Sequence, residues 1–262
     1  MDVAVAATAQ FGADVLERLA AAHDIAYVLT RPDRPRGRGR GVGPPAAKEV
    51  AARLGIEVRQ PERLGGFEPD VDAVVVVAYG ALIPTELLDR ALWLNVHPSL
   101  LPRWRGAAPV ERAIMAGDVE TGVTIHRTTA ALDAGPIAAQ RAFPIEPDDD
   151  AGVVYARAVP LAADLLEDVL AEPSFSPQPA DGATYADKIT ADDRRVDWSL
   201  PAQQVVDRVR ALSPHIGARA ELEGRPVIVW RARIEDGTAV PVEVQPEGKR
   251  RMAYEEFLRG VR

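Results

Sequence analysis

The sequence contains no cysteine, and it has no apolar run near the length of a membrane-spanning helix. Disulfides, thiolate metal ligands and thiol nucleophiles are therefore excluded. The first twelve residues, MDVAVAATAQFG, lack the basic region and apolar core of a signal peptide and fit a first strand instead. We therefore expect a cytoplasmic protein without a membrane partner.

Negative charge exceeds positive charge overall, but part of the positive charge is concentrated in one place. The net charge of −8 argues against a general nucleic-acid-binding protein. Residues 31–40, RPDRPRGRGR, nevertheless hold five arginines against the single carboxylate of Asp33. A basic segment of this kind can bind an anion even on an acidic protein.

Strand and helix patterns alternate along the first half of the chain, with short links between them. This alternation is typical of an α/β fold with a doubly wound, mostly parallel, Rossmann-like sheet. Apolar runs predict strands at 3–7, 25–30, 56–61, 71–80, 91–97 and 121–129. Amphipathic patterns predict helices at 11–24, 46–55, 84–91, 110–118 and 151–172.

Composition divides the chain into three parts. We expect a large α/β domain over 1–172 and a linker rich in Pro, Ser, Gly and Asp over 173–200. A small β-rich domain follows over 201–262, with strand patterns around 225–237 and 239–248 and a short terminal helix.

The segment NVHPSLLPRWRGAAP, residues 95–109, places polar side chains at the end of a predicted strand. Asn95 and His97 are two residues apart, so both side chains point to the same face. An amide can donate to a developing oxyanion and an imidazole can carry a proton near neutral pH, which suits acyl transfer to an amine without a covalent intermediate. The alternative is that both side chains only satisfy backbone groups at the strand end.

Asp133 lies in ALDAGPI, where Gly135 and Pro136 predict a tight turn after another strand. A carboxylate beside His97 would orient the imidazole ring and could accept, directly or through water, the proton lost by an attacking amine. The alternative is a turn residue that makes only a local hydrogen bond.

These segments, together with GDVETGVTIHRT at 117–128, occur in the order found in the formyltetrahydrofolate-dependent formyltransferases, which the chain resembles. Further matching segments cover nearly the whole chain and are typical of family members that act on methionyl initiator tRNA. They are TRPDRPRGRGR, VVVAYGALIP, TYADKIT, RVDWSLPA, VQPEGKRRM and FLRG.

The resemblance implies that the formyl group of 10-formyltetrahydrofolate passes to the α-amine of methionyl initiator tRNA, with no metal needed for the chemistry. Asn95, His97 and Asp133 match the family's catalytic residues. Asn95 and His97 would stabilise the tetrahedral intermediate, and Asp133 with His97 would handle the proton transfers. The expected protein is a monomer.

The resemblance also implies two sets of binding residues. The folate donor would contact Ser99, Leu100, Leu101 and Pro102, together with the segment containing Ala78, Tyr79, Gly80 and Leu82. The tRNA would contact Arg38, supported by Arg34, Arg36 and Arg40.

Two other segments have simpler interpretations. GRGRGVG, residues 37–43, resembles a dinucleotide-binding fingerprint only weakly, because Pro44 and Pro45 follow where a helix should begin. Without the resemblance, the arginine segment could equally be a solvated surface loop.

His126, in a predicted strand, is expected to face a packed layer.

The chain departs from the family pattern in three places. AATAQFG replaces a Gly-Thr-Pro turn near the expected folate pocket, and SPHIGAR replaces a more aromatic sequence at the start of the small domain. The family's small domain resembles an OB barrel of about five strands, but here only residues 238–241 lie between the segments IEDG and VEVQPEGK. We therefore expect an unclosed, shortened sheet.

Two alternatives to the tRNA reaction remain. The same donor could serve an amino sugar nucleotide as acceptor, which the short C-terminal part favours and the arginine segment opposes. A nucleic-acid-binding protein without activity is the other alternative, and the presence of Asn95, His97 and Asp133 opposes it.

Overall fold

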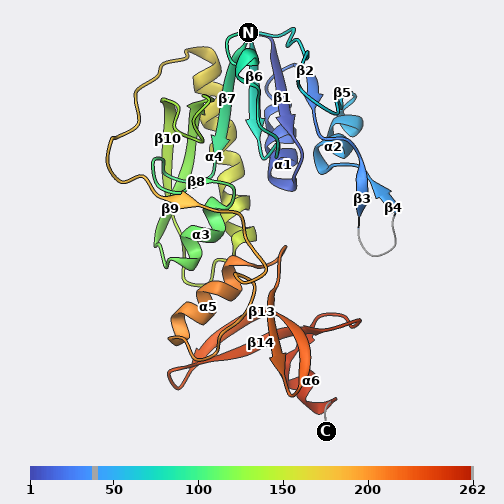
Figure 1. Cartoon of the computed structure of the whole chain (residues 1–262), viewed down its shortest axis with the longest axis vertical. Coiled ribbons are helices and arrows are strands. Elements are labelled where there is room, and N and C mark those ends of the chain that lie inside the picture. Colours follow the sequence, from blue (N-terminus) through green and yellow to red (C-terminus); the bar gives the residue numbers. More distant parts are fainter. Residues whose placement is uncertain (37–40, 261–262) are drawn as a thin grey trace. The chain divides into compact units, whose positions relative to one another are not determined.

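The computed structural model describes residues 1–36 and 41–260 (Figure 1). The helices are α1 (Gln10–Leu19), α2 (Ala46–Leu54), η1 (Thr85–Leu87, a 3-10 helix), α3 (Pro109–Met115), α4 (Ala151–Ala171), α5 (Ala202–Ala211) and α6 (Tyr254–Arg259). The strands are β1 (Val3–Ala7), β2 (Ile25–Leu29), β3 (Arg34–Arg36), β4 (Gly41–Gly43), β5 (Glu57–Arg59), β6 (Ala73–Val77), β7 (Leu92–His97), β8 (Arg105–Gly106), β9 (Glu120–Arg127), β10 (Ile137–Pro144), β11 (Tyr185–Ala186), β12 (Ala218–Leu222), β13 (Arg225–Glu235), β14 (Thr238–Pro246) and β15 (Met252–Ala253).

The chain forms two compact units, each assembled from separate segments. The first contains Met1–Arg105, Gly122–Ala142 and Ala156–Thr184. The second contains Gly106–Thr121, Phe143–Tyr155 and Tyr185–Arg262.

The first unit is built on a seven-stranded sheet in the order β10-β9-β7-β6-β1-β2-β5. The pairs β1–β2, β1–β6, β2–β5 and β6–β7 are parallel, whereas β7 and β9 are antiparallel. The mostly parallel α/β sheet predicted from the sequence is confirmed. In such a sheet, the carboxyl ends of the strands are where ligands bind.

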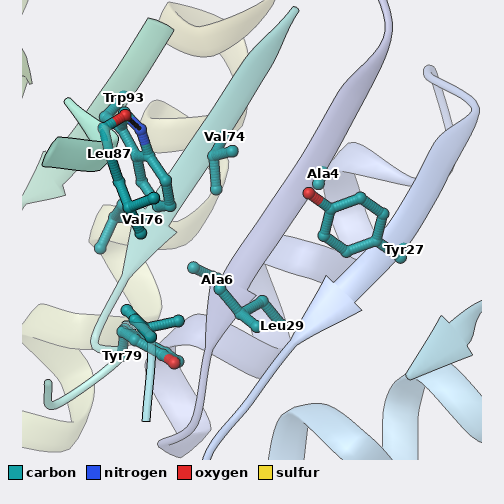
Figure 2. Close-up of a cluster of buried hydrophobic side chains, with 10 residues drawn as sticks. Ala4, Ala6, Tyr27, Leu29, Val74, Val76, Tyr79, Leu87 and Trp93 are labelled. Carbon is teal, nitrogen blue, oxygen red and sulfur yellow. Dashed lines mark hydrogen bonds between the residues drawn. The ribbon is translucent and has the colours of Figure 1, made fainter. Parts of the chain in front are cut away.

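The central strands are buried on both faces, which explains their continuous runs of small and branched apolar residues. All residues of β1 and β6 are buried. Figure 2 shows one side of this core, where Trp93 donates its indole N–H to the carbonyl oxygen of Leu87 at 2.7 Å. On α1, a Cβ at Gly12 would lie 2.3 Å from the Val77 carbonyl oxygen, so only glycine allows the helix this close to the sheet.

Three elements differ from the sequence-based expectation. The predicted helix over 84–91 is only the short η1, because its carbonyl groups enter i→i+3 turns such as Leu88 N–H to Thr85 O at 3.1 Å. Strand β3, in the basic segment, forms an antiparallel pair with β4, which follows residues 37–40. Strand β10, which the sequence analysis did not predict, forms an edge of the large sheet.

The second unit contains an antiparallel sheet in the order β12-β13-β14-β15. Its long strands β13 and β14 are joined by Asp236 and Gly237, which have φ values of 50° and 78°. Two adjacent positive φ values are typical of the tight turn that joins a two-residue hairpin. Within the described residues, β12 and β15 form the two edges of the sheet, in agreement with the expected small β-rich C-terminal part.

Among the described residues, no helix is both long enough and apolar enough to cross a membrane.

Candidate active site

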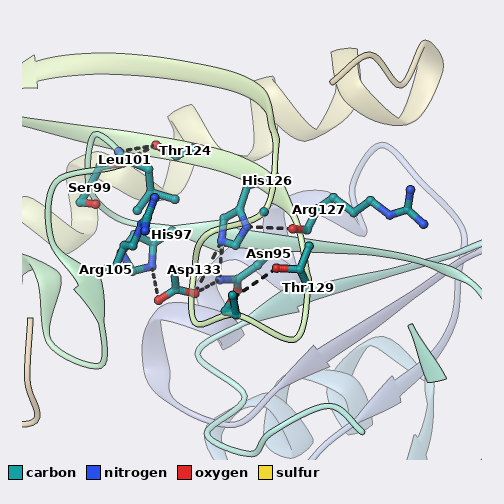
Figure 3. A network of polar contacts seen from close by, with 12 residues as sticks. Asn95, His97, Ser99, Leu101, Arg105, Thr124, His126, Arg127, Thr129 and Asp133 are labelled. Carbon is teal, nitrogen blue, oxygen red and sulfur yellow. Dashed lines mark hydrogen bonds and ion pairs between the residues drawn. The ribbon is translucent and has the colours of Figure 1, made fainter. Parts of the chain in front are cut away.

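Strand β7 carries two of the predicted catalytic residues at its carboxyl end. Asn95 and His97 are two positions apart and therefore share a face of the sheet. The antiparallel neighbour β9 places His126 opposite Asn95 and Thr124 opposite His97. The parallel-to-antiparallel change at β7 thus adds a second row of polar side chains to this site (Figure 3).

Asp133 lies in the turn between β9 and β10. Its backbone adopts φ = 45°, in the left-handed region that non-glycine residues rarely enter. A Cβ at Gly135 would lie 1.8 Å from the Arg127 carbonyl oxygen, so the turn folds tightly against the end of β9. This strained, close-packed turn aims the Asp133 carboxylate at β7.

The structure brings Asn95, His97 and Asp133 together. Asn95 Nδ2 donates to Asp133 Oδ1 at 3.2 Å, and His97 Nδ1 lies 3.7 Å from Asp133 Oδ2. The sequence analysis predicted this group, and Figure 3 shows the three side chains converging. An amide donor, an imidazole nitrogen and a carboxylate therefore meet at one point.

The tautomer of His97 follows from its surroundings. His97 Nε2 lies 2.7 Å from the carbonyl oxygen of Trp104. A carbonyl oxygen can only accept, so Nε2 carries a hydrogen, and the neutral ring presents its lone pair at Nδ1. Any proton that His97 gains must therefore bind at Nδ1, on the side of Asp133.

Burial lowers the pKa of His97 below its usual value of 6.5, while the Asp133 carboxylate and the hydrogen bond to Trp104 act in the opposite direction. The His97 side chain is 5% exposed. A neutral imidazole at neutral pH is suited to accept a proton during a reaction.

His126 belongs to the same cluster, although the sequence analysis assigned it to a packed layer. Its side chain is 2% exposed, and its Nε2 lies 3.0 Å from Asn95 Nδ2 and 3.6 Å from Asp133 Oδ1. His126 Nδ1 lies 3.1 Å from the Arg127 carbonyl oxygen, so Nδ1 is the donor and Nε2 accepts from Asn95. Both hydrogens of the Asn95 amide are thus directed, one to His126 and one to Asp133.

We expect replacement of His126 by Leu to lower kcat about tenfold, because the Asn95 amide loses one of the two acceptors that fix its orientation. His126→Gln should lose less, because a glutamine carbonyl oxygen can still accept from Asn95. Steady-state rates of the two variants, with thermal unfolding measured in parallel, test this. Equal rates for His126→Leu and the unmodified protein would contradict it.

The predicted folate-contacting loop, Ser99–Pro102, directly follows β7. Thr124 braces it by donating to the Ser99 carbonyl oxygen at 2.6 Å and accepting from the Leu101 N–H at 3.2 Å. Gln140 Nε2 donates to the Leu101 carbonyl oxygen at 3.0 Å. The side chains of Ser99 and Leu101 are buried, while Leu100 and Pro102 are half-buried.

The other predicted folate segment follows β6. The Tyr79 side chain packs in the core, so this residue offers only its main chain to a ligand, whereas Ala78, Gly80 and Leu82 are exposed. A hollow of about 340 Å³ is lined by this segment and by the start of the basic segment. Its lining residues are Thr8, Ala9, Arg31, Pro32, Arg34, Gly43, Pro45, Ala78, Tyr79 and Gly80.

Arg34 is exposed and lines this hollow, so predicted folate and tRNA residues share one wall. Arg36 ends β3. Arg38 and Arg40 lie outside the described residues. Within the described residues, no group of three or more His, Asp or Glu side chains could hold a metal ion. A larger hollow of about 610 Å³, between α1 and α4, contains none of the predicted site residues.

Comparison with known proteins identifies the family. A family model described as "Formyl transferase" matches residues 1–170, and one described as "Formyl transferase, C-terminal domain" matches residues 188–241. The chain belongs to the formyl transferase family. It is therefore a formyl-transferring enzyme, and the site at β7 lies within the residues that the first family model matches.

One formyl transferase relative is the methionyl-tRNA formyltransferase of Aromatoleum aromaticum, which is 40% identical over 99% of this chain and 94% of the relative. The solved methionyl-tRNA formyltransferase of Clostridium thermocellum has a TM-score of 0.68 at 16% identity, covering 94% of this chain and 98% of that one. An N-formyltransferase from Helicobacter canadensis, solved with folinic acid and dTDP-3-aminofucose, has a TM-score of 0.65 at 17% identity and covers 94% and 99%. The two structural matches support the fold.

Proposed function

We propose that this chain transfers the formyl group of 10-formyltetrahydrofolate to the α-amino group of methionyl initiator tRNA, with Asn95, His97 and Asp133 as catalytic residues. The observation that supports the chemistry is that Asn95 and His97 both approach the Asp133 carboxylate. Asn95 Nδ2 lies 3.2 Å from Asp133 Oδ1, and His97 Nδ1 lies 3.7 Å from Asp133 Oδ2. The chain acts in the cytoplasm as a monomer. Residues 1–172 perform catalysis, 173–200 connect, and 201–262 help to hold the tRNA.

Each catalytic group has a distinct task. Asn95 Nδ2 turns one hydrogen from its resting acceptors to the formyl oxygen, where negative charge develops. His97 Nδ1 accepts the proton of the attacking amine, and the Asp133 carboxylate stabilises that proton on the ring. His97 can then return the proton to the leaving nitrogen.

The residues present fit a folate donor. The donor, when bound, supplies an activated formyl group. The loop Ser99–Pro102 would hold it together with the main chain of Ala78–Gly80. Leu82 is 87% exposed and Leu132, next to Asp133, is 57% exposed. Such exposed apolar side chains in site loops suit the flat ring of a pterin.

Identity to relatives favours methionyl-tRNA over an amino sugar nucleotide as acceptor. The relative named above, a methionyl-tRNA formyltransferase, is 40% identical over 99% of this chain. The alignment of this chain with that relative spans 297 positions, whereas this chain has 262 residues. The relative therefore contains residues that have no counterpart in this chain. The short C-terminal sheet therefore makes the acceptor worth testing directly.

The test is formyl transfer from 10-formyltetrahydrofolate with the two acceptors side by side. We expect formylmethionyl initiator tRNA as product, and no product with amino sugar nucleotides at equal concentration. Product only with the sugar nucleotides would establish the alternative, and product with neither would overturn the proposal.

We expect replacement of Arg34, Arg36, Arg38 and Arg40 by Ala to weaken tRNA binding and flatten its dependence on salt. The slope of log K against log salt is negative, and each lost phosphate contact reduces its magnitude by about 0.7–0.9. Binding titrations at several salt concentrations measure both quantities.

A matched control is the double replacement of the exposed Arg18 and Arg63 by Ala, which should leave the slope unchanged. An unchanged affinity and slope in the quadruple variant would remove the basic segment from the tRNA site.

A further inference from the structure

Gln178 lies in the segment that the sequence analysis assigned to a linker, yet it is hydrogen-bonded to the turn that carries Asp133. Its Nε2 donates to the Asp133 carbonyl oxygen at 2.7 Å and to the Gly135 carbonyl oxygen at 2.8 Å. Its Oε1 accepts from Arg105 Nε at 3.1 Å and Nη2 at 2.6 Å. The side chain is half-buried.

These contacts allow only one orientation of the Gln178 carboxamide. Both amide hydrogens are used by carbonyl oxygens, and the amide oxygen is used by a guanidinium, which has no acceptor. Rotation by 180° would place Oε1 against two carbonyl oxygens and the NH₂ group against Arg105. The carboxamide that holds the turn therefore has its oxygen and both of its amide hydrogens in hydrogen bonds, which fixes its position.

The turn needs such support because its backbone is strained. Asp133 has φ = 45°, and Gly135 is pressed against the end of β9. The two carbonyl groups that Gln178 binds belong to the 133–134 and 135–136 peptide units, one on each side of the 134–135 peptide unit. Fixing them fixes the direction of the Asp133 carboxylate relative to His97.

The same segment also braces the other side of the site. Thr184 Oγ1 accepts from the Trp104 N–H at 2.9 Å, and Thr184 O accepts from the Arg105 N–H at 2.9 Å. Trp104 provides the carbonyl oxygen that fixes His97 Nε2. One connecting segment therefore supports both the carboxylate turn and the loop that sets the His97 tautomer.

We propose that Gln178 is a positioning residue for formyl transfer, which holds the Asp133 carboxylate against His97 by clamping the 133–135 turn to Arg105. This rests on the proposed function of Asp133. Gln178 touches neither donor nor acceptor, and it acts through the geometry of the turn.

Gln178→Glu is the decisive variant. It keeps an acceptor for Arg105 but replaces the NH₂ group, and with it both N–H donors, by one carboxylate oxygen that faces two carbonyl oxygens. We expect kcat to fall about tenfold or more, because small displacements of catalytic groups are costly, while KM for donor and tRNA stays within about twofold. Gln178→Ala, which removes the same donors without adding charge, should behave similarly. Ala180→Glu adds the same charge at an exposed position of the segment and should change neither constant.

The second readout is the titration of His97 followed by NMR in the absence of substrates, in a chain with four histidines. The groups that face His97 are Asp133, His126 and the Trp104 carbonyl oxygen. Asp133 raises the pKa of His97, so a displaced carboxylate should let His97 titrate at lower pH in both Gln178 variants, with thermal unfolding near that of the unmodified protein.

Unchanged kcat and unchanged His97 titration in both variants would overturn the proposal, as would a loss of activity without any change in that titration. If the unmodified protein failed to formylate methionyl-tRNA but His97 still responded to Gln178→Glu, the proposed acceptor would fail and the positioning role would stand.

Discussion

Replacing Asp133 with Asn is expected to reduce kcat for formyl transfer about 10³-fold, within the range that a positioned acid or base contributes. Asparagine keeps the size of the side chain but removes the negative charge 3.7 Å from His97 Nδ1. A proton arriving at Nδ1 then loses its stabilising partner. Single-turnover rates at saturating donor and methionyl-tRNA measure this step directly.

The same variant has a defined effect on the pH profile. The proposed mechanism needs neutral His97, so kcat/KM should fall as the pH drops through the pKa of His97, which lies below 6.5 because the ring is buried. Asp133 raises that pKa. Its removal should therefore move the acid limb of the profile to lower pH, even as the maximal rate falls.

The control for both measurements is Asp181→Asn, an exposed aspartate in the connecting segment, which should leave rate and profile unchanged. A rate loss of less than about tenfold for Asp133→Asn, or an acid limb that stays in place, would contradict the assigned proton transfer.

Replacing Asn95 with Ala is expected to reduce kcat about 10²- to 10³-fold, the usual cost of removing one oxyanion donor. KM values for donor and tRNA should change little, because the amide acts on charge that develops during the reaction. Asn95→Asp should be at least as slow, because it places a second carboxylate where Asp133 Oδ1 lies 3.2 Å from the amide nitrogen.

Asn95 is the only asparagine in the chain, so selective ¹⁵N labelling yields a single side-chain amide for NMR. In the free protein both amide hydrogens are directed at His126 and Asp133. Addition of a folate carrying a formyl group should shift one of these two proton signals. A catalytic rate that survives Asn95→Ala would remove the amide from the mechanism.

The sequence predicted those parts of the site that depend on local spacing. The two-residue interval places Asn95 and His97 on one face of β7, and the glycine and proline after Asp133 indicate its turn. The alternating pattern likewise predicted the parallel sheet, because a buried parallel strand such as β6 needs a continuous apolar sequence.

His126 was missed because its role depends on pairing register. Only the antiparallel pairing of β7 with β9 places it opposite Asn95, and neither the direction nor the register of that pair can be read from a histidine among apolar residues. Gln178 was missed for another reason. A polar, proline-rich segment has the composition of a linker, and nothing local shows that one of its amides reaches a turn 45 residues earlier in the chain.

The hydrogen bond between His97 Nε2 and the Trp104 carbonyl oxygen has a consequence for the order and direction of the reaction. With that nitrogen occupied, the imidazole cannot pass a proton through from one edge to the other, as a relay histidine does. It must collect and deliver at the same atom. In the proposed mechanism, the incoming amine and the departing folate nitrogen therefore reach the same edge of the ring in turn, and the proton delivered to the second is the one taken from the first.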